Sequence, residues 1–172
     1  MRLPLLITAF IASVCHGEIT ESRVVRIVDG DTLVVLDADK IQYRVRLAGI
    51  DTPERGQPFG NRAKQNLSRL AGGQGARVDW YKKDRWSRLI GTVWVQSPDT
   101  SCQEENCPKT LDVGMAQITQ GLAWHFKRYA HEQPEEQREQ YSFAEYEARA
   151  KRVGLWSDPN PIPPWDWRKR KK

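Results

Sequence analysis

Apolar and polar side chains alternate near the start of the chain in the pattern of half-buried strands. Residues 23–28 and 33–36 are rich in valine, isoleucine and leucine, and the polar segment 29–32 between them contains a glycine. Two such runs on either side of a glycine-containing turn predict a β-hairpin. Residues 41–47 then alternate strictly between apolar and polar positions, which predicts a third strand with Arg46 pointing away from its apolar face.

Three later segments carry apolar residues at the spacing of amphipathic helices. The first begins at Pro58 and ends at the paired glycines 72–73. The second spans residues 111–122, with Gly121 near its end, and the third begins near Pro134. All three predicted helices therefore come after the third strand.

Two further strands lie between the first and second predicted helices. Residues 76–82 and 89–95 are rich in strand-forming side chains, and a polar turn joins them. Five strands with three helices after and between them predict an α+β domain. This order of strands and helices favours a small closed β-barrel with a helix after its third strand.

The N-terminus has the pattern of a secretory signal peptide. Residues 1–17 combine a positive start, an apolar run of about 12 residues and small residues before Glu18. The run is too short to span a bilayer comfortably, which leaves an N-terminal strand or a retained anchor as alternatives. We expect cleavage, export to the periplasm or the medium, and no stable membrane span afterwards.

The C-terminal segment 158–172 is rich in proline and tryptophan and ends in a run of five basic residues, 168–172. We interpret this run as a solvated end, with binding of substrate phosphates as the alternative. The tryptophans of this tail are expected to pack onto the domain. The predicted organisation is therefore a signal peptide at 1–17, a folded domain at 18–157 and a tail at 158–172.

Composition and charge narrow the possible functions. A chain of 172 residues suggests one domain, and a mean hydropathy of −0.68 excludes a multi-span membrane protein. There are 27 lysines and arginines against 22 acidic residues, a net charge of +5, or +4 without residues 1–17. This modest surplus favours an anionic partner such as nucleic acid.

The cysteines agree with export. Of three cysteines, Cys102 and Cys107 remain once the signal peptide is removed, and they lie close together in a polar segment. In an oxidising compartment such a pair predicts a small-loop disulfide. A zinc site would need two further ligands, and His125 and His131 are the histidines left in the mature chain.

Several charged residues stand at the ends of predicted strands. Asp31 follows a tight turn, and Asp51 and Glu54 follow the third strand. An all-oxygen acidic set suits a hard divalent cation such as Ca²⁺ or Mg²⁺. Arg46 and Arg88, each on or beside a strand, offer the paired donors that phosphate accepts. Taken singly, each acid fits a turn and each arginine fits a surface ion pair.

The order of the short motifs makes the pattern specific. Asp-Gly-Asp-Thr at 29–32, Arg-Leu-Ala-Gly-Ile-Asp-Thr-Pro-Glu at 46–54 and Asp-Arg-Trp-Ser-Arg at 84–88 stand in register. Gly-Leu-Ala at 121–123 and Tyr129 follow them. Together they resemble the staphylococcal nuclease (thermonuclease) family over residues 22–156, and the tail is similar to those of its exported bacterial members.

The resemblance implies a five-stranded OB-fold barrel with three helices. It also implies Ca²⁺-dependent cleavage of DNA and RNA at the P–O5′ bond, leaving 3′-phosphorylated ends. By position, Asp31, Asp51 and the backbone carbonyl of Thr52 would bind calcium. Glu54 would position and deprotonate the attacking water, and Arg46 and Arg88 would hold the scissile phosphate.

Three features depart from the family pattern. Trp86-Ser87 stands where Tyr-Gly is common, and Lys127 stands where the staphylococcal enzyme has a tyrosine. With Tyr129, Trp86 and Lys127 form the expected substrate-binding wall. The segment that contains Cys102 and Cys107 is an insertion.

Two other functions remain possible for such a chain. One is a catalytically silent OB-fold protein that binds nucleic acid. The other is an envelope protein that captures a partner through the tail. Because this chain keeps all five acidic and basic side chains of the motif, we expect an active, monomeric nuclease.

Overall fold

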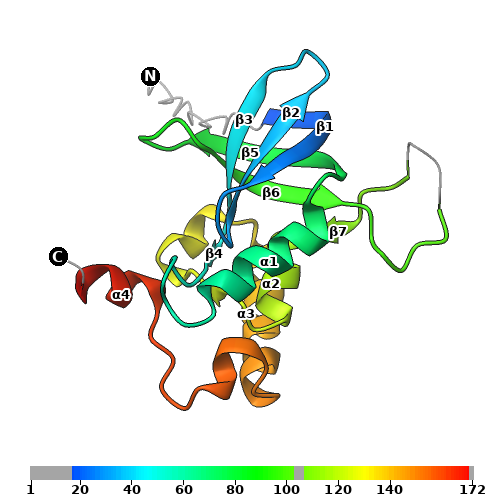
Figure 1. Cartoon of the computed structure of the whole chain (residues 1–172). Coiled ribbons are helices and arrows are strands. Elements are labelled where there is room, and N and C mark those ends of the chain that lie inside the picture. Colours follow the sequence, from blue (N-terminus) through cyan, green and yellow to red (C-terminus); the bar gives the residue numbers. More distant parts are fainter. Residues whose placement is uncertain (1–16, 103–106, 171–172) are drawn as a thin grey trace, which may run out of the picture.

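The structure, a computed structural model, describes residues 17–102 and 107–170 (Figure 1). The predicted signal peptide, apart from Gly17, lies outside these residues. The strands are β1 (Gly17–Ile27), β2 (Thr32–Asp37), β3 (Gln42–Leu47), β4 (Ile50–Asp51), β5 (Gly75–Lys83), β6 (Leu89–Val95), β7 (Leu111–Asp112) and β8 (Trp124–His125). The helices are α1 (Gly60–Ala71), α2 (Val113–Thr119), α3 (Glu135–Ala150) and α4 (Pro164–Arg170), with 3-10 turns at Lys127–Glu132 and Gly154–Ser157.

Five of the strands form a closed barrel of mixed direction. The order β3-β2-β1-β5-β6 is antiparallel throughout, and β3 then pairs with β6 in parallel, with Val45 beside Leu89 and Leu47 beside Gly91. This last pairing closes the sheet into a barrel along residues 45–47 and 89–91. The expected α+β fold with a five-stranded OB-type barrel is confirmed. β7 extends the edge of β6, and β4 pairs with β8 in a separate ladder.

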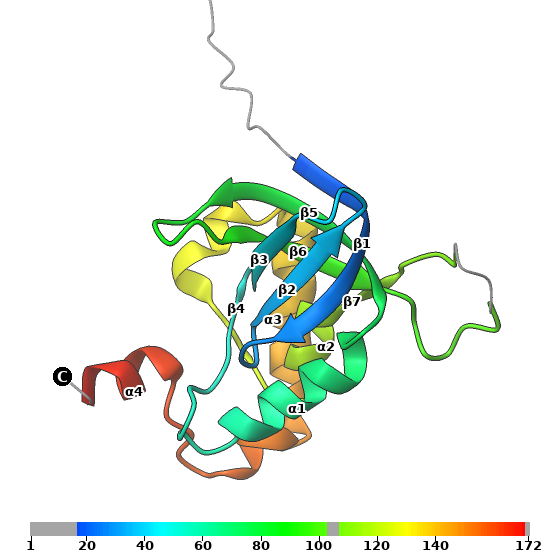
Figure 2. The ribbon, with the colours of Figure 1, turned by 45° about the horizontal axis from the view of Figure 1, so that its top comes forward.

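The barrel interior is built by alternation along the strands. Every second residue of β6 is buried, from Leu89 to Val95, while the residues between them are partly exposed. Leu67 of α1, Ile118 of α2 and Tyr141 of α3 belong to the same apolar core. Full burial of one such side chain contributes about 1.5–3 kcal/mol. The three helices thus pack together against one side of the barrel (Figures 1 and 2).

The second helix is shorter than the pattern at 111–122 predicts. Asp112 caps it, because its side chain accepts hydrogen bonds from the backbone N–H groups of Gly114 and Met115 at 2.8 and 3.1 Å. Residues 111–112 consequently pair with β6 as β7. Gly121 follows the helix as expected, with φ of 63°, and a Cβ there would lie 2.2 Å from the carbonyl oxygen of Val153.

The C-terminal tail is docked as far as Arg168, whose ion pairs with Asp51 and Glu54 depart from the predicted solvated end. Lys169 and Arg170 are exposed, as that prediction expects. Trp165 stacks on Phe126 with ring centroids 5.5 Å apart and meets Trp124 edge-on at 6.3 Å. The side-chain amide of Gln57 donates to the carbonyl oxygen of Ile162 at 2.6 Å. Trp165 therefore packs onto the domain as predicted. A protein that captured a partner through its tail would need this side chain to be free.

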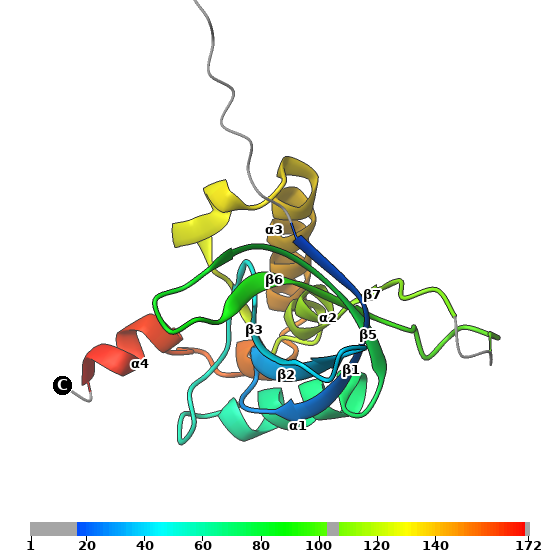
Figure 3. The ribbon, with the colours of Figure 1, turned by 90° about the horizontal axis from the view of Figure 1, so that it is seen from above.

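The expected disulfide between Cys102 and Cys107 is present. It closes the loop between β6 and β7, on the side of the molecule away from α4 (Figure 3). No helix within the described residues is both long and apolar enough to cross a membrane.

Candidate active site

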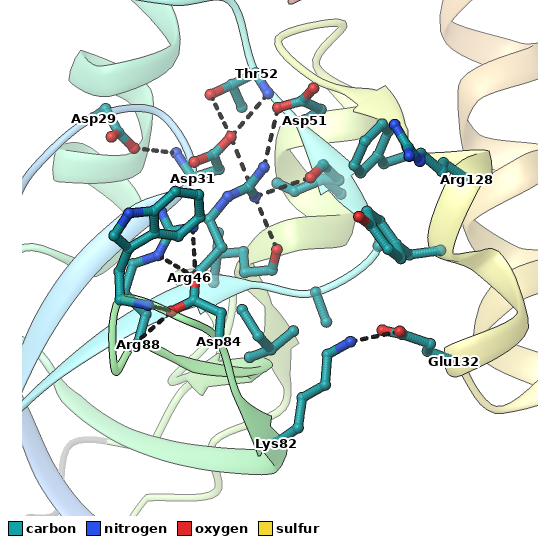
Figure 4. Close-up of a pocket in the computed structure, with 18 of the residues that line it drawn as sticks. Asp29, Asp31, Arg46, Asp51, Thr52, Lys82, Asp84, Arg88, Arg128 and Glu132 are labelled. Atoms are coloured by element: carbon teal, nitrogen blue, oxygen red, sulfur yellow. Dashed lines mark hydrogen bonds and ion pairs between the residues drawn. The ribbon is translucent and has the colours of Figure 1, made fainter. Parts of the chain in front are cut away.

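Four turns converge on one pocket of about 510 Å³ at an end of the barrel (Figure 4). They are the β1–β2 turn, the end of β3 with β4, the β5–β6 turn, and the segment after β8. The parallel pairing of β3 with β6 brings the first and third of these together across Arg46. The backbone N–H of Leu47 donates to the carbonyl oxygen of Asp31 at 2.8 Å, which fixes the β1–β2 turn beside β3.

Arg46 lies at the centre of the acidic side of the pocket. Its Nη1 is 3.2 Å from Oδ2 of Asp31, and its Nη2 is 3.0 Å from Oδ1 of Asp51. Nη1 also donates to the carbonyl oxygens of Leu47 and Ile50 at 3.0 and 2.9 Å. One guanidinium therefore holds two buried carboxylates, Asp31 and Asp51, whose residues lie on different turns (Figure 4).

Thr52 and Gly30 hold the turn that carries Asp31 close to the turn that carries Asp51. The backbone N–H and the hydroxyl of Thr52 both donate to Oδ2 of Asp31 at 2.9 Å. A Cβ on Gly30 would lie 2.7 Å from both Oγ1 of Thr52 and Cβ of Ala63. The close approach of the two turns consequently requires glycine at position 30.

The balance of burial and neighbouring charges lowers the pKa of one buried carboxylate of the pocket and raises the pKa of two others. Burial alone would raise the pKa of Asp31, but the charge of Arg46 and the hydrogen bonds from Thr52 outweigh it and lower that pKa. At Asp51 burial prevails, and the pKa is raised despite Arg168 and Arg46. Burial and the charge of Asp31 raise the pKa of Asp29 to about 6. Burial is thus the main reason that Asp29 and Asp51 hold their protons more tightly than a free aspartic acid does.

This donor set fits a hard divalent cation. Within residues 17–102 and 107–170, no group of three or more His, Cys, Asp or Glu forms a metal-binding cluster. The set expected from the sequence needs two carboxylates, Asp31 and Asp51, and the carbonyl oxygen of Thr52. All of these donors are oxygens, the ligands that hard cations of charge +2 prefer.

Arg88 lines the same pocket from the β5–β6 turn (Figure 4). Its Nε and Nη2 are both 2.7 Å from Oδ2 of Asp84. The other oxygen of Asp84 accepts from the backbone N–H groups of Trp86 and Arg88 at 2.9 and 3.0 Å. Burial would raise the pKa of Asp84, but these hydrogen bonds and Arg88 lower it. Asp84, whose part sequence reasoning missed, therefore fixes the second arginine.

The expected substrate-binding wall is partly assembled. Trp86 is 60% exposed, lines the pocket and lies against Arg85, whose guanidinium carbon is 4.1 Å from its ring centroid. Tyr129 lines the opposite side and is also exposed. Lys127 is not among the lining residues, and its ammonium pairs instead with the buried Glu145 of α3 at 3.5 Å.

The tail contributes a residue that the sequence did not indicate. Arg168 on α4 places Nη2 2.8 Å from Oδ2 of Asp51 and Nη1 2.5 Å from Oε1 of Glu54. Burial would lower its pKa, but the hydrogen bonds and charges of these carboxylates raise it above the usual value. Arg168 stands 117 positions after Asp51, and no local spacing signals their contact.

Comparison with known proteins places the chain in a family. Residues 44–158 match the family described as Staphylococcal nuclease homologue. The chain belongs to the staphylococcal nuclease family. As a member of the staphylococcal nuclease family, the protein is a nuclease, a hydrolase of phosphodiester bonds.

Three bacterial relatives extend the similarity over most of the chain. Protein ParB of Escherichia coli is 42% identical over 160 residues, which cover 92% of this chain and 84% of that protein. Micrococcal nuclease of Shigella flexneri is 42% identical over 152 residues, 87% and 81% respectively. An uncharacterized endonuclease of Haemophilus influenzae is 36% identical over 168 residues, 98% and 84% respectively.

Proposed function

We propose that this nuclease is a calcium-dependent endonuclease that cleaves DNA and RNA and leaves 3′-phosphorylated ends. The observation that carries the proposal is the bridge that Arg46 makes between Asp31 and Asp51, in the pocket that Arg88 also lines. This arrangement supports a cation and two guanidinium groups acting on one phosphate. The catalytically silent alternative would have no need of these buried charges.

The chain's own residues have separate parts in the proposed reaction. Asp31, Asp51 and the Thr52 carbonyl would hold Ca²⁺, which when bound neutralises charge on the phosphate and acidifies water. Arg46 and Arg88 donate N–H groups to the phosphate oxygens as negative charge develops. Glu54, partly exposed at the pocket rim, accepts the proton of the attacking water. The oxygen of the attacking water bonds to phosphorus as the P–O5′ bond breaks, and the departing 5′ oxygen takes up a proton from solvent water.

The aromatic wall supports a nucleic-acid substrate. Trp86 and Tyr129 both line the pocket and expose much of their rings. Stacking of a base on such a ring contributes about 1–3 kcal/mol and depends little on base identity. This supports cleavage with weak sequence preference in both DNA and RNA.

Cleavage assays test the proposal directly. Plasmid DNA and a single-stranded RNA are incubated with the protein in calcium or in a chelator, and the ends of the products are analysed. We expect calcium-dependent cleavage to 3′-phosphates, abolished by Asp31→Asn. Asp39→Asn is the matched control, because it makes the same substitution at an exposed aspartate of the β2–β3 turn, outside the pocket. Undiminished cleavage in chelator contradicts the calcium dependence, and binding without cleavage favours the silent alternative.

We also propose that the protein is exported, to the periplasm or beyond. The N-terminal pattern of residues 1–17 and the disulfide between Cys102 and Cys107 support this location. Cell fractionation with N-terminal sequencing tests it. A full-length protein that begins at Met1 in the cytoplasmic fraction would contradict export.

A further inference from the structure

The C-terminal helix places a cation of the chain itself on the acidic side of the active site. Oδ2 of Asp51 accepts from Nη2 of Arg168 at 2.8 Å, and Oδ1 lies 3.3 Å from Nη1. Oδ1 of Asp51 also accepts from Arg46 at 3.0 Å. Nη1 of Arg168 reaches Glu54 as well. Both oxygens of Asp51 are therefore bonded to guanidinium groups.

The fold holds Arg168 in this position through contacts other than its ion pairs. Trp165, one turn earlier on α4, stacks on Phe126, and Pro164 at the start of the helix is buried. The bond from Gln57 to the carbonyl oxygen of Ile162 fixes the approach to the helix. The packing of Trp165 and the hydrogen bond to Ile162 thus position the guanidinium of Arg168 beside the carboxylates.

Arg168 and a calcium ion compete for the same oxygens. Calcium binds 6–8 oxygens at 2.3–2.6 Å, so a calcium on Asp51 would lie close to the guanidinium that now bonds this carboxylate. Two cations at that separation repel each other strongly in a partly buried site. Withdrawal of Arg168 frees Oδ2 of Asp51 for calcium, while Arg46 still bonds Oδ1.

We infer that Arg168 is a built-in competitor that occupies the Asp51–Glu54 carboxylates and is displaced by calcium, so that the tail sets the calcium affinity of the site. The inference rests on the proposed calcium dependence. Displacement costs the charge-assisted hydrogen bonds of Arg168, and such bonds are among the strongest in proteins. The site consequently binds calcium more weakly than its carboxylates alone would allow.

Calorimetric titration of calcium into the full chain tests this without reference to activity. The variants are Arg168→Gln, which removes the guanidinium, and Lys169→Gln, a matched control. Lys169 carries the same charge one position later and bonds Asp166 of its own helix. A third variant, Trp165→Ala, keeps Arg168 but removes the apolar anchor of α4.

We expect Arg168→Gln to bind calcium about 10- to 100-fold more tightly than the wild type, the range that hydrogen bonds to charged groups imply. Trp165→Ala should shift the affinity in the same direction, and Lys169→Gln should change it less than threefold, as expected for an exposed charge. Equal or weaker binding by Arg168→Gln overturns the inference, as does an equal shift in Lys169→Gln.

The outcome separates this inference from the proposed function. If wild type and Arg168→Gln bind calcium equally and cleave DNA in its presence, the competition is wrong and the calcium dependence stands. If neither binds calcium, both proposals are wrong. Calcium binding by Arg168→Gln alone would mean that calcium does not displace Arg168 from the wild type, which overturns the inference.

Discussion

Replacement of Arg46 by alanine should show that Arg46 has two roles, one in stabilising the buried carboxylates and one in catalysis. Its side chain is 15% exposed and lies 3.2 and 3.0 Å from oxygens of Asp31 and Asp51. A unit charge pair at about 4 Å contributes about 4 kcal/mol at an effective dielectric of 20, before desolvation is subtracted. Removal of one partner from a buried pair costs about 3–5 kcal/mol. We therefore expect Arg46→Ala to lower the unfolding free energy by about 3–5 kcal/mol when a chelator is present.

Calcium should return part of the stability that Arg46→Ala loses, because an ion of charge +2 also neutralises Asp31 and Asp51. Turnover should not return. A guanidinium directed at phosphate oxygens accelerates phosphoryl transfer by about 10³–10⁵ where it has been measured, or about 4–7 kcal/mol. Arg46→Lys keeps the charge without the two-pronged donor and should recover stability more than turnover.

The assay combines denaturant unfolding, in chelator and in calcium, with initial rates on DNA at saturating calcium. A folded Arg46→Ala protein with kcat within tenfold of the wild type would refute the role of Arg46 at the phosphate. Unchanged unfolding free energy in chelator would refute the bridge between the carboxylates as a stabilising contact. The two measurements test the two parts of the reasoning separately.

Three further predictions concern other parts of the chain. Asp84→Asn weakens the bonds that fix Arg88, so steady-state kinetics should show kcat about 10- to 100-fold lower with unchanged calorimetric calcium affinity. Cys102→Ser should lower the unfolding free energy in denaturant titration by at most about 2 kcal/mol and leave kcat unchanged. Burial raises the pKa of Asp112, so its ionisation costs the folded state and stability is lost as pH rises from about 4 through that pKa. Unfolding of Asp112→Asn measured across this range should show a shallower loss.

The barrel could be predicted from the sequence because its determinants are local. Alternation of side chains along a strand fixes which face is buried, and the limits predicted for 89–95 are those of β6. The helix predicted at 111–122 was too long because its apolar spacing continues into residues that pair as strand. Asp112, a side chain that caps a helix, was the local signal for the true start.

In the candidate site, too, residues that are close in sequence could be predicted and a distant one could not. Asp31, Arg46 and Asp51 lie within 20 positions of one another, and the ordered motifs indicated that they share one site. Arg168 lies in a run of basic residues, which as a pattern predicts a solvated end. Its contact with Asp51 depends on the packing of Trp165 across the chain, and no spacing along the sequence encodes that contact. Lys127 shows the converse, because a position expected at the pocket pairs with α3 instead.

The balance of charge in the pocket explains why both a tail arginine and a divalent ion suit it. Four carboxylates and two guanidinium groups line the acidic side: Asp29, Asp31, Asp51, Glu54, Arg46 and Arg168. Two further arginines line the pocket away from this side: Arg88, which is matched by Asp84, and Arg128 in the segment after β8. With all four acids ionised, this side lacks two positive charges. Burial is the main cause of the raised pKa values of Asp29 and Asp51, and the charge of Asp31 adds to both. Exchange of Arg168 for an ion of charge +2 reduces the deficit by one. The exchange is therefore favoured by charge and opposed by the bonds of Arg168, so the tail can tune the affinity for the ion while the carboxylates stay in place.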